Sequence, residues 1–350
     1  MEISAGSASE AEIEQATPAT TGGRREPAPT PGRPPLRAWL QPSLIALVVV
    51  AAFIACYVGL QRDPQAHHIP VAVTGPDLPG EIRQALGDAV DVHPVPDAEA
   101  ARRAVQRHDV TAAISASGPH TLRLAIAGAA GKSTASAVSS LVEAYAHGAG
   151  EELRTEDVVP LARFDTRGLA GFYVAFGVSL AGFVLGSNTL GLSAVMRLRH
   201  RLWLLGGTSL AIGIVAAILV GPVLHAVPAP VAPLMATLGL LAAAAAFTTT
   251  FLGSYLGPVG LPITTLLILT VGNATSGAVI GADLLPAAAR SVSALLPPGA
   301  AVRAITDLSY FNGAHIAGPA ITLALWAASA ALLIGLHPRL TRRRAKNDAA

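Results

Sequence analysis

The sequence has 350 residues, of which 52% are hydrophobic and only 13% charged, and its mean hydropathy is +0.52. Soluble globular domains carry about 25% charged residues, so this composition excludes an ordinary soluble protein and indicates an integral membrane protein. The net charge of +2 is small because the charges are segregated along the chain, and the single cysteine, Cys56, excludes an intrachain disulfide.

The chain begins with a polar segment, residues 1–42, that is rich in Pro, Ala, Thr and Ser and has no apolar periodicity. Such a composition cannot bury a core, so we predict a disordered cytoplasmic tail. The run SLIALVVVAAFIACYVGL follows at residues 43–60. Because a spanning helix needs about 20 mostly apolar residues, this run is predicted as the first transmembrane helix. It lies too deep in the chain for a cleaved signal peptide.

Residues 61–167 have the mixed composition of a small soluble domain. Strand patterns occur at residues 69–75, 109–116 and 121–128, with helical spacing between them and a further helix after GKST. The predicted order β-α-β-α-β-β-α indicates a compact α/β domain between the first and second transmembrane helices.

Residues 168–337 are predicted to form a transmembrane domain of five helices. There is no Asp, Glu, Lys or Arg from residue 168 to 196 or from 202 to 282. One span is expected at residues 168–192. The others are expected at residues 202–224, 231–253, 261–281 and 317–336. The fold class is therefore an α-helical polytopic membrane protein with six transmembrane helices.

Residues 282–316 are too polar and too interrupted by proline to span a membrane. We predict one or two helices at the outer membrane interface there, partly embedded. The most distinctive residues of this segment are Pro286, Arg290, Pro297, Pro298 and Tyr310.

Six spans place both termini on the same side of the membrane, and the positive-inside rule makes that side the cytoplasm. Arg197, Arg199 and Arg201 lie between the second and third spans, and the tail at residues 338–350 is also basic. The α/β domain is then extracytoplasmic, and both termini are cytoplasmic. The arginine cluster either anchors the loop or contacts a cytoplasmic partner.

The segment GAAGKST, which begins at Gly128, resembles a phosphate-binding loop but does not have its spacing. The motif GxxxxGK[ST] requires a glycine at position 126, which is Ile126. We instead predict a strand-to-helix turn bent at Gly128 and Gly131, with Ser133 or Thr134 capping the helix. No metal-ligand spacing and no nucleophile–base set is visible, so neither a cofactor nor an enzymatic activity is expected.

Polar residues within the spans are costly in lipid and therefore informative. Asn188 lies in the second span, and Asn273, Thr275, Ser276 and Gly277 lie together in the fifth. They either form hydrogen bonds between helices or line a pathway through the membrane. Small residues four apart, Gly182 and Gly186, predict close helix packing in the second span.

A span, an α/β domain and five further spans together resemble type-2 ABC transporter permeases, and more narrowly the phage-infection-protein-like (YhgE/Pip) branch found in actinobacteria and firmicutes. The stretch VGNATSGAVIGADLLPAAARSVSALLPPGAAVRAITDLSYFNG is similar to the C-terminal signature of that branch. AAGKSTASAV is similar to another of its stretches. The long extracytoplasmic coiled coil of larger members is missing here.

The resemblance implies a permease-type subunit that moves an amphipathic or lipid-like molecule outward, powered by a separate ATPase. It also implies pairing with a second copy or with a similar permease. The alternative is a membrane-anchored envelope scaffold or receptor whose α/β domain binds a cell-envelope partner without transport. The lipid bilayer is the other expected partner, and no nucleic acid is expected.

Overall fold

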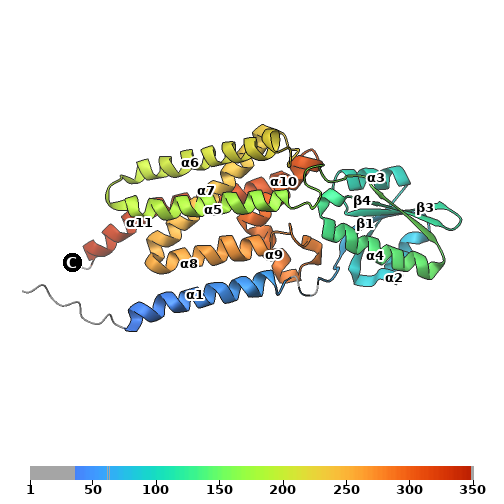
Figure 1. Ribbon diagram of the computed structural model, residues 1–350, viewed down its shortest axis with the longest axis horizontal. Helices are drawn as coiled ribbons and strands as arrows, with labels where there is room; N and C mark the ends of the chain where they lie inside the picture. Colours follow the sequence, from blue (N-terminus) through green and yellow to red (C-terminus); the bar gives the residue numbers. More distant parts are fainter. Residues whose placement is uncertain (1–35, 61, 63, 348–350) are drawn as a thin grey trace, which may run out of the picture. The chain divides into compact units, whose positions relative to one another are not determined.

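The computed structural model describes residues 36–60, 62 and 64–347. Most of the predicted N-terminal tail and the last three residues of the basic tail therefore lie outside the described residues. Residues 1–44 and 45–350 form separate units, and all the contacts below lie within the second. The chain is mostly helical, with a small mixed sheet and five helical segments in the described chain that are long and apolar enough to cross a membrane (Figure 1).

The first candidate span lies in helix α1, Leu36–Tyr57. The helix starts seven residues before the predicted span and continues through Pro42. None of the apolar stretch Leu40–Tyr57 is buried within the protein; Leu47, for example, is 64% exposed. Most of the surface of this helix is apolar and exposed, which suits a lipid environment; on one side, Val49 and Phe53 border a groove shared with Leu261.

The sheet domain, residues 69–157, contains the predicted order of elements followed by one strand that was not predicted. The elements are β1 (Ile69–Thr74), α2 (Leu78–Leu86), β2 (Val90–Val95), α3 (Ala98–Gln106), β3 (Ala112–Gly118), β4 (Thr121–Ile126), α4 (Lys132–Ala149) and β5 (Glu152–Asp157). The strand order is β2-β1-β3-β4-β5, and only the β3–β4 pair is antiparallel. β5 was missed because its sequence, ELRTED, is polar and mostly exposed.

Helices cover both faces of the sheet, so that α3 lies on one face and α2 and α4 on the other (Figure 1). Each of the two apolar cores also contains a residue from the C-terminal half of the chain. Leu284 belongs to the core under α4, and Phe311 to the core under α3. The sheet domain is therefore completed by segments from the C-terminal half of the chain that precede the last helix, Ala317–Asn347.

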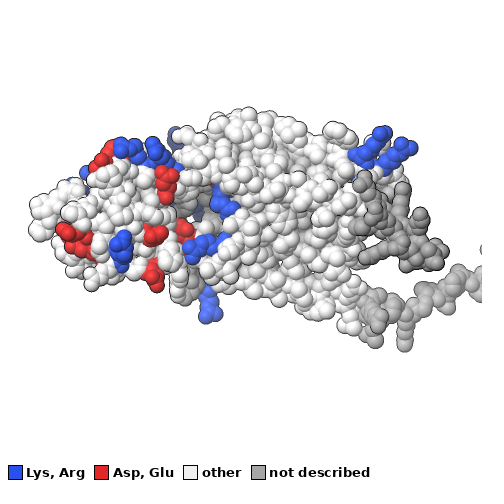
Figure 2. All heavy atoms as spheres, turned by 180° about the vertical axis from the view of Figure 1, so that it is seen from behind, with Lys and Arg blue, Asp and Glu red and all other residues white. Residues whose placement is uncertain are grey.

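The helical bundle consists of α5 (Ala170–Gly191), α6 (Leu198–Ile218), α7 (Val231–Leu256), α8 (Gly260–Thr264) with the π-helical turn η6 (Thr265–Gly272), α10 (Pro297–Tyr310) and α11 (Ala317–Asn347). α7 packs against α5, α6, α10 and α11. On the face shown in Figure 2, charged side chains gather over the sheet domain, and a basic group lies at the opposite end of the bundle. Apart from basic side chains at the junction with the sheet domain, the described surface between them carries no charge on that face, as expected of a region that faces lipid.

The segment Val231–Gly272 is a continuous apolar stretch of 42 residues that folds back on itself. α7 ends at Gly257, whose φ of 59° is unfavourable for other residues. After this turn, Ile268 and Leu269 of η6 pack against Ala245 of α7. The second limb has 5 residues in α8 and 8 in η6, which gives a length of about 20 Å, shorter than the roughly 30 Å hydrocarbon core of a bilayer. The predicted helix over 261–281 therefore ends early.

Small residues bring α5 and α7 into backbone contact, as predicted from Gly182 and Gly186. A Cβ atom added at Gly186 would lie 2.5 Å from the carbonyl oxygen of Ala246, and one at Gly182 would lie 2.5 Å from that of Ala242. Neither carbonyl can move without disturbing α7.

We therefore expect Gly186→Ala to lower the free energy of unfolding by about 1–3 kcal/mol, the usual cost of overpacking. Gly177→Ala on the same helix is the matched control, because an added Cβ there meets nothing within 4 Å. Thermal unfolding in detergent measures both variants. Equal stability of the two would contradict the close α5–α7 contact.

Candidate functional site

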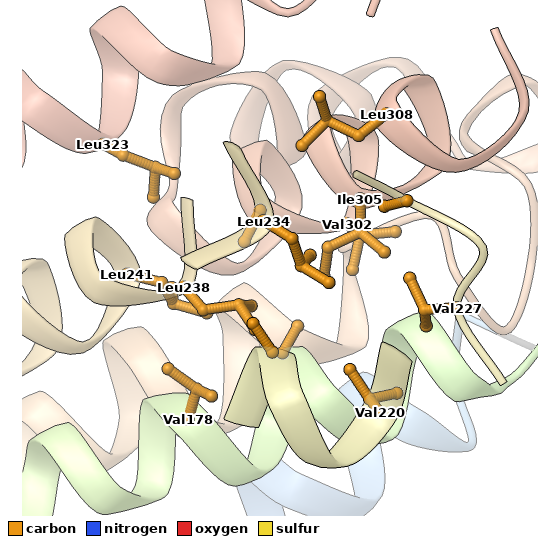
Figure 3. Packing of buried hydrophobic residues seen from close by; sticks show 14 of the residues in the cluster. Val178, Val220, Val227, Leu234, Leu238, Leu241, Val302, Ile305, Leu308 and Leu323 are labelled. Carbon is orange, nitrogen blue, oxygen red and sulfur yellow. The ribbon is translucent and has the colours of Figure 1, made fainter. Parts of the chain in front are cut away.

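A cavity of about 240 Å³ lies where the bundle meets the sheet domain. Its walls come from the start of α4, the start of α5, the segment after η6 and one face of α10. The apolar side includes Val227, Val302 and Ile305, which also belong to the bundle core. Figure 3 shows these three side chains lying together beside Leu234 of α7.

The GKST segment forms the turn into α4, as predicted, but its hydroxyl groups do not cap that helix. The N-cap residue is Gly131, and no side chain accepts a capping hydrogen bond. Instead the hydroxyl of Ser133 accepts a hydrogen bond of 2.8 Å from the backbone N–H of Gly281. Lys132 donates to the carbonyl of Thr166 at 3.3 Å. The motif thus joins the sheet domain to the segment that follows η6.

The close approach of Gly281 to α4 needs a residue without a side chain. A Cβ atom at Gly281 would overlap the hydroxyl of Thr134. GAAGKST and the segment that ends at Gly281 therefore meet at one wall of the cavity, although 148 positions separate Ser133 from Gly281.

The residues predicted at the helix break divide into two groups. The side-chain amide of Asn273 donates to the carbonyls of Ile268, at 2.9 Å, and Leu269, at 3.4 Å. Thr275 donates to Val271 at 2.8 Å. These two side chains satisfy backbone groups of η6. Ser276 and Gly277 instead line the cavity, and Gly277 has a φ of 84°.

The other predicted membrane-depth residue, Asn188, is exposed on α5 and does not line the cavity. Among the described residues, the structure therefore does not bring it together with the break in the second limb. Its position on a lipid-facing surface could not be read from sequence, because α5 has nearly uniform hydrophobicity around its circumference.

The three predicted partner-contact arginines also differ from one another. Arg197 and Arg199 are exposed in the α5–α6 loop and the first turn of α6, whereas Arg201 is only 9% exposed. A surface for a partner at this end of the bundle can therefore include the first two residues but little of the third.

The segment predicted to lie at the membrane interface contains α10, which is largely buried against other helices of the protein. Pro297 and Pro298 begin α10 and are buried with most of that helix against α5, α7 and α11. Its small residues explain the tight fit; a Cβ added at Gly299, for example, would overlap the backbone of Ser293. Tyr310, at the end of α10, accepts a hydrogen bond of 3.2 Å from the N–H of Ala162.

Helix α9, Ala287–Leu295, precedes α10 and is more exposed. Pro286 is exposed beside it, and Arg290 donates to the carbonyl of His67 at 3.2 Å. Arg303 of α10 donates to the carbonyls of Ser293 and Ala294, each at 3.2 Å. These bonds satisfy the C-terminal carbonyl groups of α9, which have no partner within the helix.

A histidine–aspartate pair next to the cavity joins the sheet domain to α10. Nδ1 of His108 lies 3.0 Å from Oδ1 of Asp307, whose side chain is 4% exposed. The ring of His108 stacks on Phe311 at 4.2 Å, and His108 adopts a φ of 62°. A second pair, His315 and Asp109, lies 3.4 Å apart. No local sequence pattern indicates the His108–Asp307 pair, because 199 positions separate the two residues.

Asp283 is a further ionisable residue of the cavity wall that no sequence pattern indicated. Burial raises the pKa of its carboxyl above the ordinary value, and the positive charges of Arg290 and His108 offset part of that effect. The folded protein therefore holds the proton of Asp283 more tightly than the unfolded chain does. The contribution of Asp283 to stability is therefore largest at low pH and falls as the pH rises through the interval between the unfolded and folded pKa values of this carboxyl.

We expect Asp283→Asn to be more stable than the wild type at pH 7, because the neutral amide removes the cost of a buried carboxylate. The difference should shrink as the pH falls towards about 4, where the unfolded aspartate also becomes protonated. Melting temperatures in detergent between pH 4 and 8 measure this. The control is Asp77→Asn, at an exposed position without a capping bond. A less stable Asp283→Asn protein at pH 7 would contradict the expectation.

In the part of the chain that the structure describes, no group of three or more His, Cys, Asp or Glu side chains is placed to hold a metal ion. No protein-family model matches the sequence, and comparisons with curated proteins and with solved structures find no significant match. The resemblance to phage-infection-protein-like permeases therefore stays a prediction.

Proposed function

We propose that the protein is the membrane permease-type subunit of an ABC-like exporter, which moves an amphipathic or lipid-like molecule outward using a separate cytoplasmic ATPase. The observation that carries the proposal is the cavity at the end of the second limb, Gly260–Gly272. Its walls combine apolar bundle residues with hydroxyl and carboxylate groups. An amphipathic ligand needs both kinds of contact.

The interruption of the second limb supports a transport role. In lipid, backbone polar groups must be satisfied internally, so irregular backbone at membrane depth is tolerated only inside protein or beside a cavity. The segment after η6 meets this condition, since Gly281 donates to Ser133 and Ser276 lines the cavity. Broken helices beside a binding site are a recurrent device of transporters.

For the topology, we propose that the second limb of the Val231–Gly272 hairpin crosses the membrane together with the irregular segment that follows η6, which extends it beyond its own length of about 20 Å. The hairpin then supplies two passages, and the chain has six in total. The sheet domain then lies outside a bacterial plasma membrane, and both termini lie in the cytoplasm. The exposed Arg197 and Arg199 support this orientation, because basic residues near span ends favour the cytoplasmic side. These residues would also face the ATPase. Pairing with a second permease-type subunit is part of the same proposal.

The competing function is an envelope receptor or scaffold without transport. It is favoured by the way Leu284 and Phe311 complete the two cores of the sheet domain. A domain held by two such contacts is a fixed platform, which suits the binding of an extracytoplasmic partner.

Purification of the full-length protein from its native membrane, after cross-linking, separates the two functions. For a permease we expect an ATPase subunit to co-purify with the wild type and to be lost in the double variant Arg197→Glu, Arg199→Glu. The matched control reverses the charge at two exposed arginines of the sheet domain, in the double variant Arg123→Glu, Arg154→Glu. Recovery of an envelope component that depends only on the sheet-domain arginines, with no ATPase, would favour the receptor.

A further inference from the structure

The charged groups that line the cavity can be separated into those already engaged and those still available. The carboxylate of Asp165 accepts hydrogen bonds from the N–H groups of Leu169 and Ala170, at 2.9 and 3.1 Å, at the start of α5. Arg303 is held by the end of α9. His108 is paired with Asp307. Each of these three charges has a structural partner.

Asp283 differs from these groups, because its carboxylate makes no hydrogen bond or ion pair with the described residues. Arg290, the nearby cation, donates to the carbonyl of His67 instead, and influences Asp283 only through the longer-range Coulomb interaction. A partly buried carboxylate without a partner is costly unless it is protonated or a ligand supplies a positive charge.

Ser276 lies on the same segment of the cavity wall, but its hydroxyl oxygen is enclosed by protein. The residue is 2% exposed, and the hydroxyl has no hydrogen-bond partner among the described residues. Because that oxygen has essentially no accessible surface, a ligand in the cavity does not reach it in this conformation. Asp283 is therefore the group on this segment that a ligand can use: a carboxylate accepts hydrogen bonds, and an ammonium group has only donors to offer.

We propose that the cavity binds the cationic head of an amphipathic amine, with the ammonium group at Asp283 and the apolar part along Phe172, Val227 and Ile305. This inference names the ligand class of the proposed exporter and rests on that function for the movement of the ligand; the binding itself requires neither ATP nor a partner subunit. An anionic head is disfavoured, because Asp165 and Asp283 both line the cavity and its one guanidinium is engaged.

The single cysteine makes a direct binding test possible. Full-length protein carrying Cys56→Ser and Thr306→Cys places one thiol on the cavity wall. The rate at which a neutral thiol reagent modifies that cysteine, in nanodiscs of neutral lipid, is measured with increasing hexylamine, hexanol or hexanoate. A probe that occupies the cavity slows the modification.

We expect hexylamine to protect the cysteine at concentrations at least about 10-fold lower than hexanol or hexanoate, since close charge pairs in buried sites give coupling of this size or more. Asp283→Asn should abolish the stronger protection by hexylamine, and Asp77→Asn should preserve it. A cysteine in place of the exposed Ser117 should show no protection.

Equal protection by hexylamine and hexanol, stronger protection by hexanoate, or no protection at all would overturn the proposal. If Asp283→Asn does not fold, the comparison of the three probes still decides the question. Protection without any associated ATPase would leave the amine site intact and count against the exporter. An associated ATPase together with stronger protection by hexanoate would overturn the amine site and leave the exporter proposal standing.

Discussion

Replacing Phe311 by alanine should lower the free energy of unfolding by about 3–5 kcal/mol, the usual cost of removing a buried aromatic ring. Phe311 is 2% exposed and belongs to the core beneath α3, although it follows α10 in sequence. Its ring also stacks on His108. The loss should loosen the sheet domain from the bundle as well as reduce stability.

Thermal unfolding of the purified protein measures the change, and limited proteolysis of the sheet domain measures the loosening. Phe164→Ala is the matched control, because that ring is 65% exposed, and it should change stability little. Similar losses in the two variants would show that Phe311 does not hold the two regions together.

Replacing His108 by asparagine should lower the free energy of unfolding by about 3 kcal/mol. This value is at the lower end of the range for breaking a buried pair, because the His108 side chain is itself 30% exposed. The substitution leaves the buried Asp307 carboxylate without its hydrogen bond. Asparagine tolerates the left-handed backbone at this position better than most residues, so the loss reports the side-chain contacts rather than backbone strain.

The exposed pair of His93 and Asp91 provides the control for that experiment. Its atoms lie 3.4 Å apart, and its side chains are 50% and 60% exposed. Exposed ion pairs contribute about 0–1 kcal/mol, so His93→Asn should remain close to the wild type in chemical or thermal unfolding. If both histidine variants lost the same stability, the His108–Asp307 pair would have no special role in joining the sheet domain to α10.

The coarse architecture could be predicted from sequence, because it depends on local composition and periodicity. The charge-free runs mark the apolar helices, and the alternation of residues such as those in TLRLAIAG marks a strand. The close packing at Gly182 and Gly186 follows from residue size alone. Each of these features is encoded within about twenty neighbouring residues.

The candidate site could be predicted only in part, because it depends on contacts between distant segments. Ser276 and Gly277 were identified from the polar interruption of an apolar run, and both line the cavity. Asp283 lay just beyond that run and was passed over as part of an interfacial segment. Nothing local in the sequence indicates that α10 is buried or that Gly281 meets the start of α4.

Transport through the cavity is tested most directly by filling it. Thr306→Phe places a ring in the cavity, and Thr322→Phe places the same ring at a half-buried position of α11 that does not line the cavity. The measurement is ATP-dependent movement of a fluorescent lysophosphatidylcholine in proteoliposomes that contain the protein and its ATPase partner. We predict at least about a 10-fold loss of rate for Thr306→Phe, equivalent to about 1.4 kcal/mol, and wild-type rates for Thr322→Phe. Wild-type movement by a correctly folded Thr306→Phe protein would contradict a transport role for the cavity.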